Sequence, residues 1–136
     1  MGWRIVVTAD RAYYDRMRAS ADAGAPPVIF PAYCPERRFS LDGNEVLIGR
    51  LSRSRGIIPQ VDLTGPPEDA AVSHMHALLV ATPAGTWSLV DLDSANGTYL
   101  NDAPEQLTPH QPVELSDGDR VHVGGWTTLT LTLHAT

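Results

Sequence analysis

The chain has 136 residues, a formal net charge of −6 and a hydrophobic content of 43%, as expected of one globular domain with a real core. The negative charge argues against nucleic acid as the main partner. No apolar run is as long as a membrane span, and nothing at the start resembles a secretory signal. We therefore expect a cytoplasmic domain that makes no contact with membranes or nucleic acid.

Cysteine and basic residues narrow the chemistry further. Cys34 is the only cysteine, so an intrachain disulfide is impossible and a reducing compartment fits. All 10 basic residues are arginine, a bias that a GC-rich bacterial genome would explain, and we take a bacterial, actinobacterial-like source as a hypothesis. Any cationic patch must then be built from guanidinium groups, which suit bidentate contacts with phosphate.

The first part of the chain mixes a strand with a helix. Residues 3–8 are apolar and β-branched, which predicts a strand. Asp10 is a suitable N-cap for a short helix over residues 11–19, whose apolar face should lie on the sheet. Residues 20–35 are rich in Ala, Gly and Pro and predict a loop, with a brief edge strand at 28–30.

The middle of the chain predicts a hairpin followed by a long polar loop. Strands at 38–41 and 45–48 flank a turn of Asp, Gly and Asn. Residues 51–72 are polar and interrupted by Gly and Pro, with room for short strands at 57–58 and 61–63.

The rest of the chain predicts strands and turns. A hairpin is expected from 77–82 and 86–92. Leucine alternates with threonine near the end of the chain, which indicates a half-buried strand. The further strands are expected at 99–100, 105–107, 112–115, 120–123 and 126–133. Many short strands with regular turn signals predict an all-β sandwich.

Three short motifs stand where these strands meet loops. Gly49 and Arg50 close the apolar run 46–48, and Ser73 and His76 precede the run 77–80. The third motif, Asn96-Gly97-Thr98, follows the strand at 87–92. Binding groups tend to cluster on loops at the end of a rigid sheet, so these motifs are the candidate site.

Gly-Arg, Ser-x-x-His and Asn-Gly-Thr in this order, with strands between them, resemble the pattern of forkhead-associated domains. Residues 115–124 also look like the late hairpin of that family, and the resemblance covers roughly residues 38–133. It implies a β-sandwich of two antiparallel sheets whose apical loops bind phosphothreonine peptides. The short helix and Pro-rich loop would be an insertion near the N-terminus. We expect one domain over 1–136, with strand and insertion in 1–37 and the core motifs in 38–136.

The resemblance also assigns roles to individual residues. The phosphopeptide-binding positions are Arg50, Ser73, His74, Ala95 and Asn96. The structural positions are Gly49, His76, Gly97 and Thr98, and His76 would hold neighbouring loop backbone. His74 stands where the family offers a polar side chain to the ligand, and its alternative is a surface residue at the start of a strand.

Two departures from the family pattern support an alternative function. Ala95 stands where family members often carry a hydroxyl residue, which removes one possible donor to phosphate. The loop over 51–72 is also longer than is typical of the family. The alternative is a forkhead-associated fold that binds its partner independently of phosphorylation.

An enzyme active site and a metal site are weaker interpretations of the same residues. Ser73, His76 and Asp91 could be imagined as a triad, but no Gly-x-Ser-x-Gly elbow surrounds the serine. Four histidines lack the spacing of a zinc finger: His74, His76, His110 and His122. We therefore expect no enzyme activity, catalytic residue, metal or cofactor, and a phosphothreonine-dependent interaction module downstream of a Ser/Thr kinase.

Overall fold

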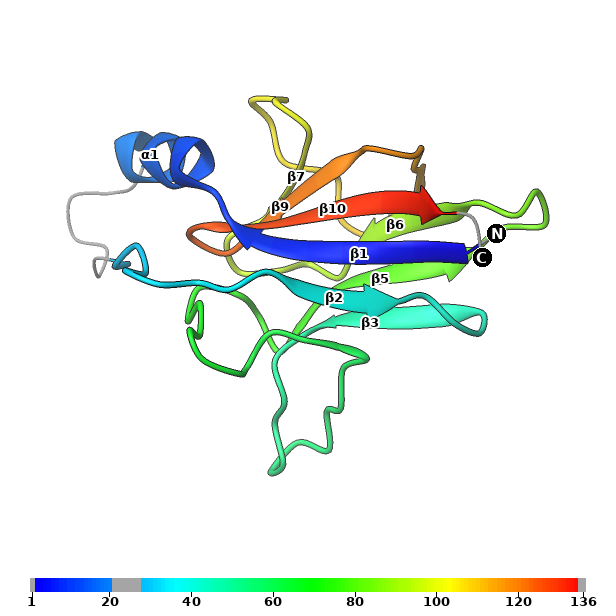
Figure 1. Cartoon of the computed structure of the whole chain (residues 1–136), viewed down its shortest axis with the longest axis horizontal. Helices are drawn as coiled ribbons and strands as arrows, with labels where there is room; N and C mark the ends of the chain where they lie inside the picture. Colours follow the sequence, from blue (N-terminus) through cyan, green and yellow to red (C-terminus); the bar gives the residue numbers. More distant parts are fainter. Residues whose placement is uncertain (1, 21–27, 135–136) are drawn as a thin grey trace.

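The computed structural model describes residues 2–20 and 28–134, which form a β-sandwich with one helix (Figure 1). The first five-stranded sheet contains, in spatial order, β2 (Arg37–Ser40), β1 (Gly2–Ala9), β10 (Thr127–His134), β9 (Arg120–Val123) and β7 (Thr98–Leu100). The second contains β4 (Val61–Asp62), β3 (Glu45–Gly49), β5 (Met75–Ala81), β6 (Trp87–Asp91) and β8 (Val113–Glu114). The predicted all-β sandwich is confirmed.

Strand pairing brings the two ends of the described chain together. β1 lies between β2 and β10 and pairs with both in antiparallel register, so the ends of the described chain lie side by side (Figure 1). All pairs but one are antiparallel, because β4 runs parallel to β3. The predicted sandwich of antiparallel sheets is confirmed, with this one parallel pair at its edge, where the long loop returns β4 in the direction of β3.

The core lies between the sheets and follows the alternation seen in the sequence. Leu129 and Leu131 of β10 are completely buried, whereas Thr130 between them is partly exposed. Ile5 and Val7 of β1 face the same core, as do residues of the second sheet such as Leu79. The predicted half-buried last strand is therefore confirmed.

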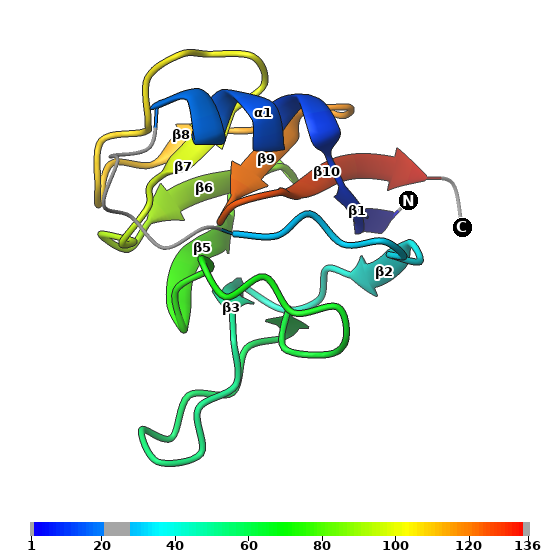
Figure 2. The same cartoon turned by 90° about the vertical axis from the view of Figure 1, so that its left-hand side faces the viewer.

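Helix α1 (Arg11–Ser20) packs on the first sheet near the turn between β9 and β10, as the two views show (Figures 1 and 2). Asp10 caps it, because its Oδ1 accepts a hydrogen bond from the Tyr13 N–H at 3.1 Å. The Tyr13 ring stacks on His122 at 4.9 Å between centroids, and its hydroxyl donates to the Gly124 carbonyl at 2.7 Å. The predicted cap, helix and inward apolar face are confirmed. No helix in the described ranges is long and apolar enough to span a membrane.

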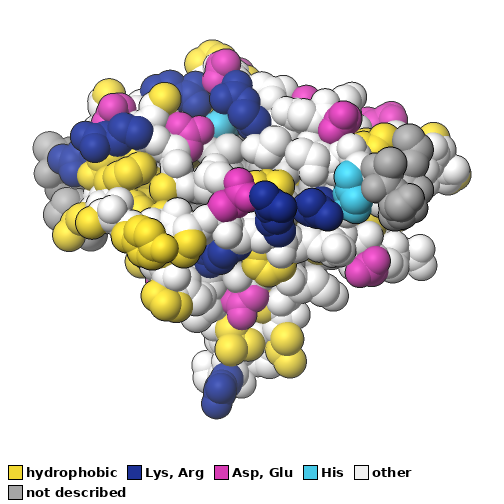
Figure 3. Space-filling model, in the orientation of Figure 1, with side chains coloured by type: hydrophobic (Ala, Val, Ile, Leu, Met, Phe, Trp, Pro, Cys, Tyr) yellow, Lys and Arg dark blue, Asp and Glu magenta, His cyan; other side chains and the backbone are white. Residues whose placement is uncertain are grey.

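Three expected short strands do not form as strands. At 28–30, Ile29 is 81% exposed and the Phe30 ring packs edge-on against Trp126, so side-chain packing replaces a sheet edge. In the space-filling view of Figure 3, hydrophobic side chains gather beside α1 on the face turned toward the viewer. At 105–107 one main-chain bond from Leu107 to Thr98 is made and no ladder follows. At 57–58, Ile57 makes an isolated bridge with Ser52.

The long loop between β3 and β5 has two parts. Its first part projects away from the sandwich and narrows at the Ser52–Ile57 bridge (Figures 1 and 2). Its second part, from β4 onward, returns to the start of β5 and lies against the body of the domain (Figure 1). This second part carries residues that complete the candidate site. Residues 21–27 of the predicted loop over 20–35 lie outside the described residues.

Candidate functional site

The site lies at the edge where β3 ends and β5 begins. Gly49 has no room for a side chain, because a Cβ there would overlap the main-chain carbonyl of His74. The close approach lets the Arg50 N–H donate to the His74 carbonyl at 3.1 Å. A glycine is therefore required here to bring Arg50 against the strand that begins after Ser73.

The Arg50 side chain is held in place by the loop that precedes β5. Its Nε donates to the Val72 carbonyl at 2.5 Å, and one Nη lies 3.7 Å from a Glu68 carboxylate oxygen. The side chain remains 18% exposed. A guanidinium has five N–H donors, so donors remain for a ligand after the bond to Val72 is made.

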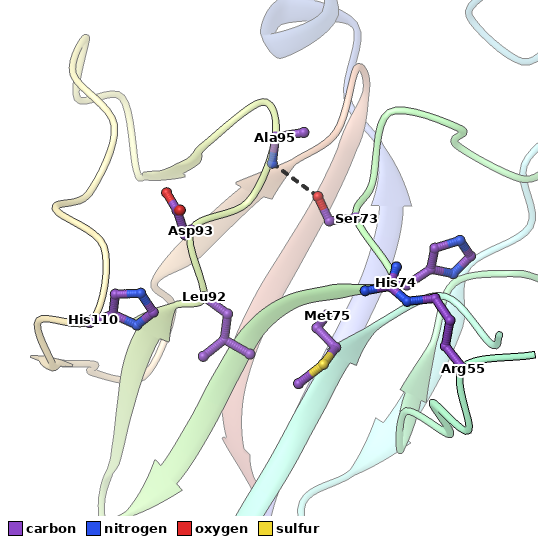
Figure 4. Close-up of a pocket in the computed structure, with 8 residues that line it drawn as sticks. All are labelled: Arg55, Ser73, His74, Met75, Leu92, Asp93, Ala95 and His110. Carbon is purple, nitrogen blue, oxygen red and sulfur yellow. Dashed lines mark hydrogen bonds between the residues drawn. The ribbon is translucent and has the colours of Figure 1, made fainter.

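Ser73 and the loop between β6 and β7 are joined directly. The Ala95 N–H donates to Ser73 Oγ at 3.0 Å (Figure 4). Because Ser73 Oγ is the acceptor in that bond, its own hydrogen stays available for a ligand oxygen. The position before the asparagine thus contributes its main chain to the site although Ala95 has no hydroxyl.

His76 connects the same two loops through a hydrogen bond to each. It is fully buried, its Nδ1 accepts from the Ser73 N–H at 3.0 Å, and its Nε2 donates to the Gly97 carbonyl at 3.0 Å. Burial lowers the pKa of His76 below its ordinary value. The ring is therefore neutral, with the proton on Nε2, which is the form that both bonds need.

Asn96 closes the site from the β6–β7 side. Its Nδ2 donates to the Ala71 carbonyl at 2.9 Å, which leaves a second N–H and the amide oxygen for a ligand. Gly97 has a φ of 84°, so the turn needs a glycine. Thr98 is buried and its hydroxyl donates to Asp91 at 2.6 Å, which fixes the start of β7.

His74 points its ring back to the strand end. Its Nδ1 lies 3.0 Å from the Arg50 carbonyl, which can only accept, so Nδ1 carries the proton of this bond. His74 also lines a depression of about 490 Å³ beside Ser73. The lining residues are Arg55, Ser73, His74, Met75, Leu92, Asp93, Ala95 and His110 (Figure 4).

The structure thus brings all five predicted binding positions to one edge, and adds lining residues that the sequence did not assign to the binding site. Met75 and Leu92 give the depression apolar side chains, and His110 stands across it from His74 (Figure 4). His110 is placed by a bond from its N–H to the Asp91 carbonyl at 2.9 Å. Met75 lies inside the Ser-x-x-His motif, which was an available signal, whereas nothing near His110 in the sequence relates it to the site.

Asp69 is a buried carboxylate that the sequence did not single out. It is 1% exposed, and its carboxylate accepts from the N–H groups of Gly125 and Trp126, each at 3.0 Å, and from the Thr127 hydroxyl at 2.8 Å. It also accepts from the Ala71 N–H at 3.1 Å. Asp69 therefore ties the turn 69–72, which bonds Arg50 and Asn96, to the hairpin of the opposite sheet.

The imagined Ser-His-Asp relay is not assembled. Asp91 accepts from the hydroxyls of Ser94 and Thr98, each at 2.6 Å, and both nitrogens of His76 bond main-chain groups instead. Within residues 2–20 and 28–134, no group of three or more His, Cys, Asp or Glu side chains is placed to hold a metal ion.

The buried histidines predict how stability depends on pH. Burial lowers the pKa of His76, and likewise that of His122, whose Nδ1 bonds Thr128 Oγ1 at 2.7 Å. As pH falls below the unfolded value of 6.5, the unfolded chain binds these protons first, so stability present at pH 7.5 should be lost. Urea unfolding at pH 7.5 and 5.5 measures the loss. His76→Gln should be less stable but less pH-dependent, and equal wild-type stability at both values would contradict the account.

Known proteins share both the sequence pattern and the fold. The model of the FHA domain matches residues 46–124, more than half of the chain. An FHA domain-containing protein of Arabidopsis thaliana is 33% identical over 87 residues, which is 64% of this chain and 20% of that protein. The solution structure of the FHA domain of an Arabidopsis thaliana hypothetical protein has a TM-score of 0.65 at 21% identity, and covers 99% of this chain and 87% of that one.

A structure with a bound ligand is also similar. Mycobacterium tuberculosis EmbR, in complex with a low affinity phosphopeptide, has a TM-score of 0.55 and 26% identity, over 74% of this chain and 22% of EmbR. The chain spans about a fifth of the length of the Arabidopsis relative that it matches. With the family model, the two sheets and the three motifs in agreement, the chain belongs to the FHA (forkhead-associated) domain family.

Proposed function

We propose that this FHA domain binds phosphothreonine-containing peptides at the edge formed by Arg50, Ser73 and Asn96. The observation that carries the proposal is the convergence of three donor side chains, each fixed by main-chain bonds and each with a donor to spare. A phosphate dianion prefers such charge-assisted donors. Ala95 contributes a main-chain contact to Ser73, and His74 lines the adjoining depression. The phosphopeptide complex of EmbR supports the assignment.

The proposal extends to the setting of the protein. We infer one FHA domain over residues 1–136, acting in a bacterial cytoplasm downstream of a Ser/Thr kinase and without contact to nucleic acid. The arginine-only basic residues, the single cysteine and the net charge of −6 support this setting. The domain would act as a binding module and not as an enzyme, and it would need no cofactor.

A phosphothreonine peptide library tests the function. The immobilised domain is incubated with a degenerate library, and the same library treated with phosphatase is the control. We expect retention of phosphorylated peptides alone, and weaker retention of a matched phosphoserine library. Equal retention of both treatments would contradict the proposal.

The second candidate is a scaffold that binds its partner without phosphate. It is favoured by one observation, namely that Arg50 already bonds Val72 and lies near Glu68 in the free protein. Ala95 also lacks the hydroxyl that the resemblance leads one to expect. Partner binding that survives both phosphatase treatment and Arg50→Ala would select this function.

Ala95→Thr tests whether a missing donor limits affinity. Ala95 is exposed and lines the depression beside Ser73, so a hydroxyl there can reach a bound phosphate. One added hydrogen bond stabilises by about 0.5–1.5 kcal/mol, so phosphopeptide affinity should rise about two- to tenfold. Calorimetric titration gives the affinity, and Ala95→Val is the control of equal shape. If both variants bind alike, the hydroxyl has no role.

A further inference from the structure

In the free protein, the Arg50 guanidinium already lies beside a carboxylate. Its Nη1 lies 3.7 Å from Glu68 Oε1, and the two side chains are 18% and 41% exposed. The pair is therefore partly shielded from water, which strengthens it relative to a fully exposed surface pair. Glu68 places a negative charge beside the guanidinium that the proposed function assigns to phosphate.

The position of Glu68 is fixed by its neighbour. Asp69 is buried and bonded to three groups of the segment 125–127, and the Val72 N–H donates to the Asp69 carbonyl at 3.1 Å. The main chain of Glu68 therefore cannot move away from Arg50 while this turn is intact. Its side chain, which is 41% exposed, can still rotate into solvent.

A carboxylate and a phosphate compete for the same donors. Both offer oxygen acceptors to the guanidinium fork, but a phosphate at neutral pH carries nearly two charges and a carboxylate one. A bound phosphate would also repel Glu68, because like charges this close raise the free energy of the complex. A phosphate can therefore displace Glu68 from Arg50. A glutamate on a peptide offers the guanidinium the same single charge as Glu68 and has no such advantage.

We propose that Glu68 is an internal competitor that occupies Arg50 until a phosphorylated ligand displaces it. The inference rests on the proposed function and deepens it, since Glu68 would set both the affinity and the discrimination. It would lower the affinity for every anionic ligand, and keep peptides with Glu or Asp in place of phosphothreonine below the threshold for binding.

Glu68→Gln tests the inference, and Glu45→Gln is the matched control. Glu45 is exposed at the other end of β3, so the control makes the same charge change away from Arg50. The probes are the phosphothreonine peptide selected from the library and the same peptide with Glu in place of phosphothreonine. We expect Glu68→Gln to bind the phosphopeptide about three- to tenfold tighter, and to bind the Glu peptide more tightly than the wild type does. Glu45→Gln should change neither affinity by more than about twofold.

The possible failures are distinguishable. If the wild type binds the phosphopeptide and Glu68→Gln binds it equally or more weakly, the competitor role is wrong and the proposed function stands. If neither the wild type nor Glu68→Gln retains any phosphopeptide from the library, the proposed function is wrong and the inference with it. The NMR signal of the Arg50 Nε–H gives a readout without any ligand. It should move in Glu68→Gln and stay in place in Glu45→Gln, and an unmoved signal in both would overturn the contact itself.

Discussion

Asp69→Asn should lower the free energy of unfolding by about 3 kcal/mol, the largest loss of stability that we expect from one isosteric change. The carboxylate accepts from two main-chain N–H groups and one hydroxyl of the segment 125–127, and from the Ala71 N–H. Hydrogen bonds to a charged group contribute about 1.5–3 kcal/mol each, and an unpaired buried donor costs a similar amount. An asparagine keeps one oxygen but turns an NH₂ group toward donors.

Urea unfolding measures the effect, and Asp42→Asn is the control, since it makes the same change at an exposed turn. For a chain of this size the unfolding midpoint of Asp69→Asn should fall by about 1–2 M, and that of the control should not move. Phosphopeptide affinity of the folded variant should fall too, because the turn 69–72 supplies the carbonyls that hold Arg50 and Asn96. A change of stability below about 1 kcal/mol would show that the carboxylate is replaceable.

Arg50→Ala should weaken phosphopeptide binding at least about tenfold while the fold survives. The variant removes charge-assisted hydrogen bonds of about 1.5–3 kcal/mol in all, and 1.4 kcal/mol corresponds to one decade of affinity. The fold should survive because Gly49, Ser73 and His76 keep their own main-chain bonds. Calorimetric titration gives the affinity and circular dichroism checks the fold.

Arg53→Ala is the matched control for Arg50→Ala. Arg53 is exposed at the tip of the projecting loop, so its loss changes the net charge equally. A long-range effect of charge would weaken both variants alike, and this would be reduced by salt. A tenfold loss confined to Arg50→Ala would locate the phosphate at the guanidinium, whereas an unchanged titration would refute the assignment of the site.

Much of the fold could be predicted because the deciding contacts are local in sequence. The Asp10 cap acts within one helical turn, and the alternation of leucine and threonine in β10 repeats every second residue. The Asn96-Gly97 turn needs its glycine at a positive φ, which is a property of the turn alone. Each of these features is encoded by residues only a few positions apart.

The failures of prediction involve contacts between distant segments. Asp69 finds its partners 56 to 58 positions later, so nothing beside it in the sequence distinguishes it from an exposed loop acid. The parallel pairing of β4 depends on how the long loop folds back on β3. Residues 105–107 have the composition of a strand, but only Leu107 finds a main-chain partner, on Thr98.

The candidate site shows both cases. The motifs indicated which residues gather at the edge, because each motif stands at the end of a strand and the sandwich brings those ends together. They did not indicate that Arg50 would be bonded to Val72 and lie beside Glu68. That arrangement depends on the second part of the long loop, whose path the sequence does not reveal.

An NMR titration with the library-selected phosphopeptide shows directly whether phosphate is bound at the edge formed by Arg50, Ser73 and Asn96. We expect the largest amide shifts at Arg50, Ser73, Ala95 and Asn96, and no shifts from the same peptide without its phosphate at equal concentration. Equal shifts with both peptides, or shifts confined to the outer faces of the sheets, would contradict phosphate-dependent binding at this edge.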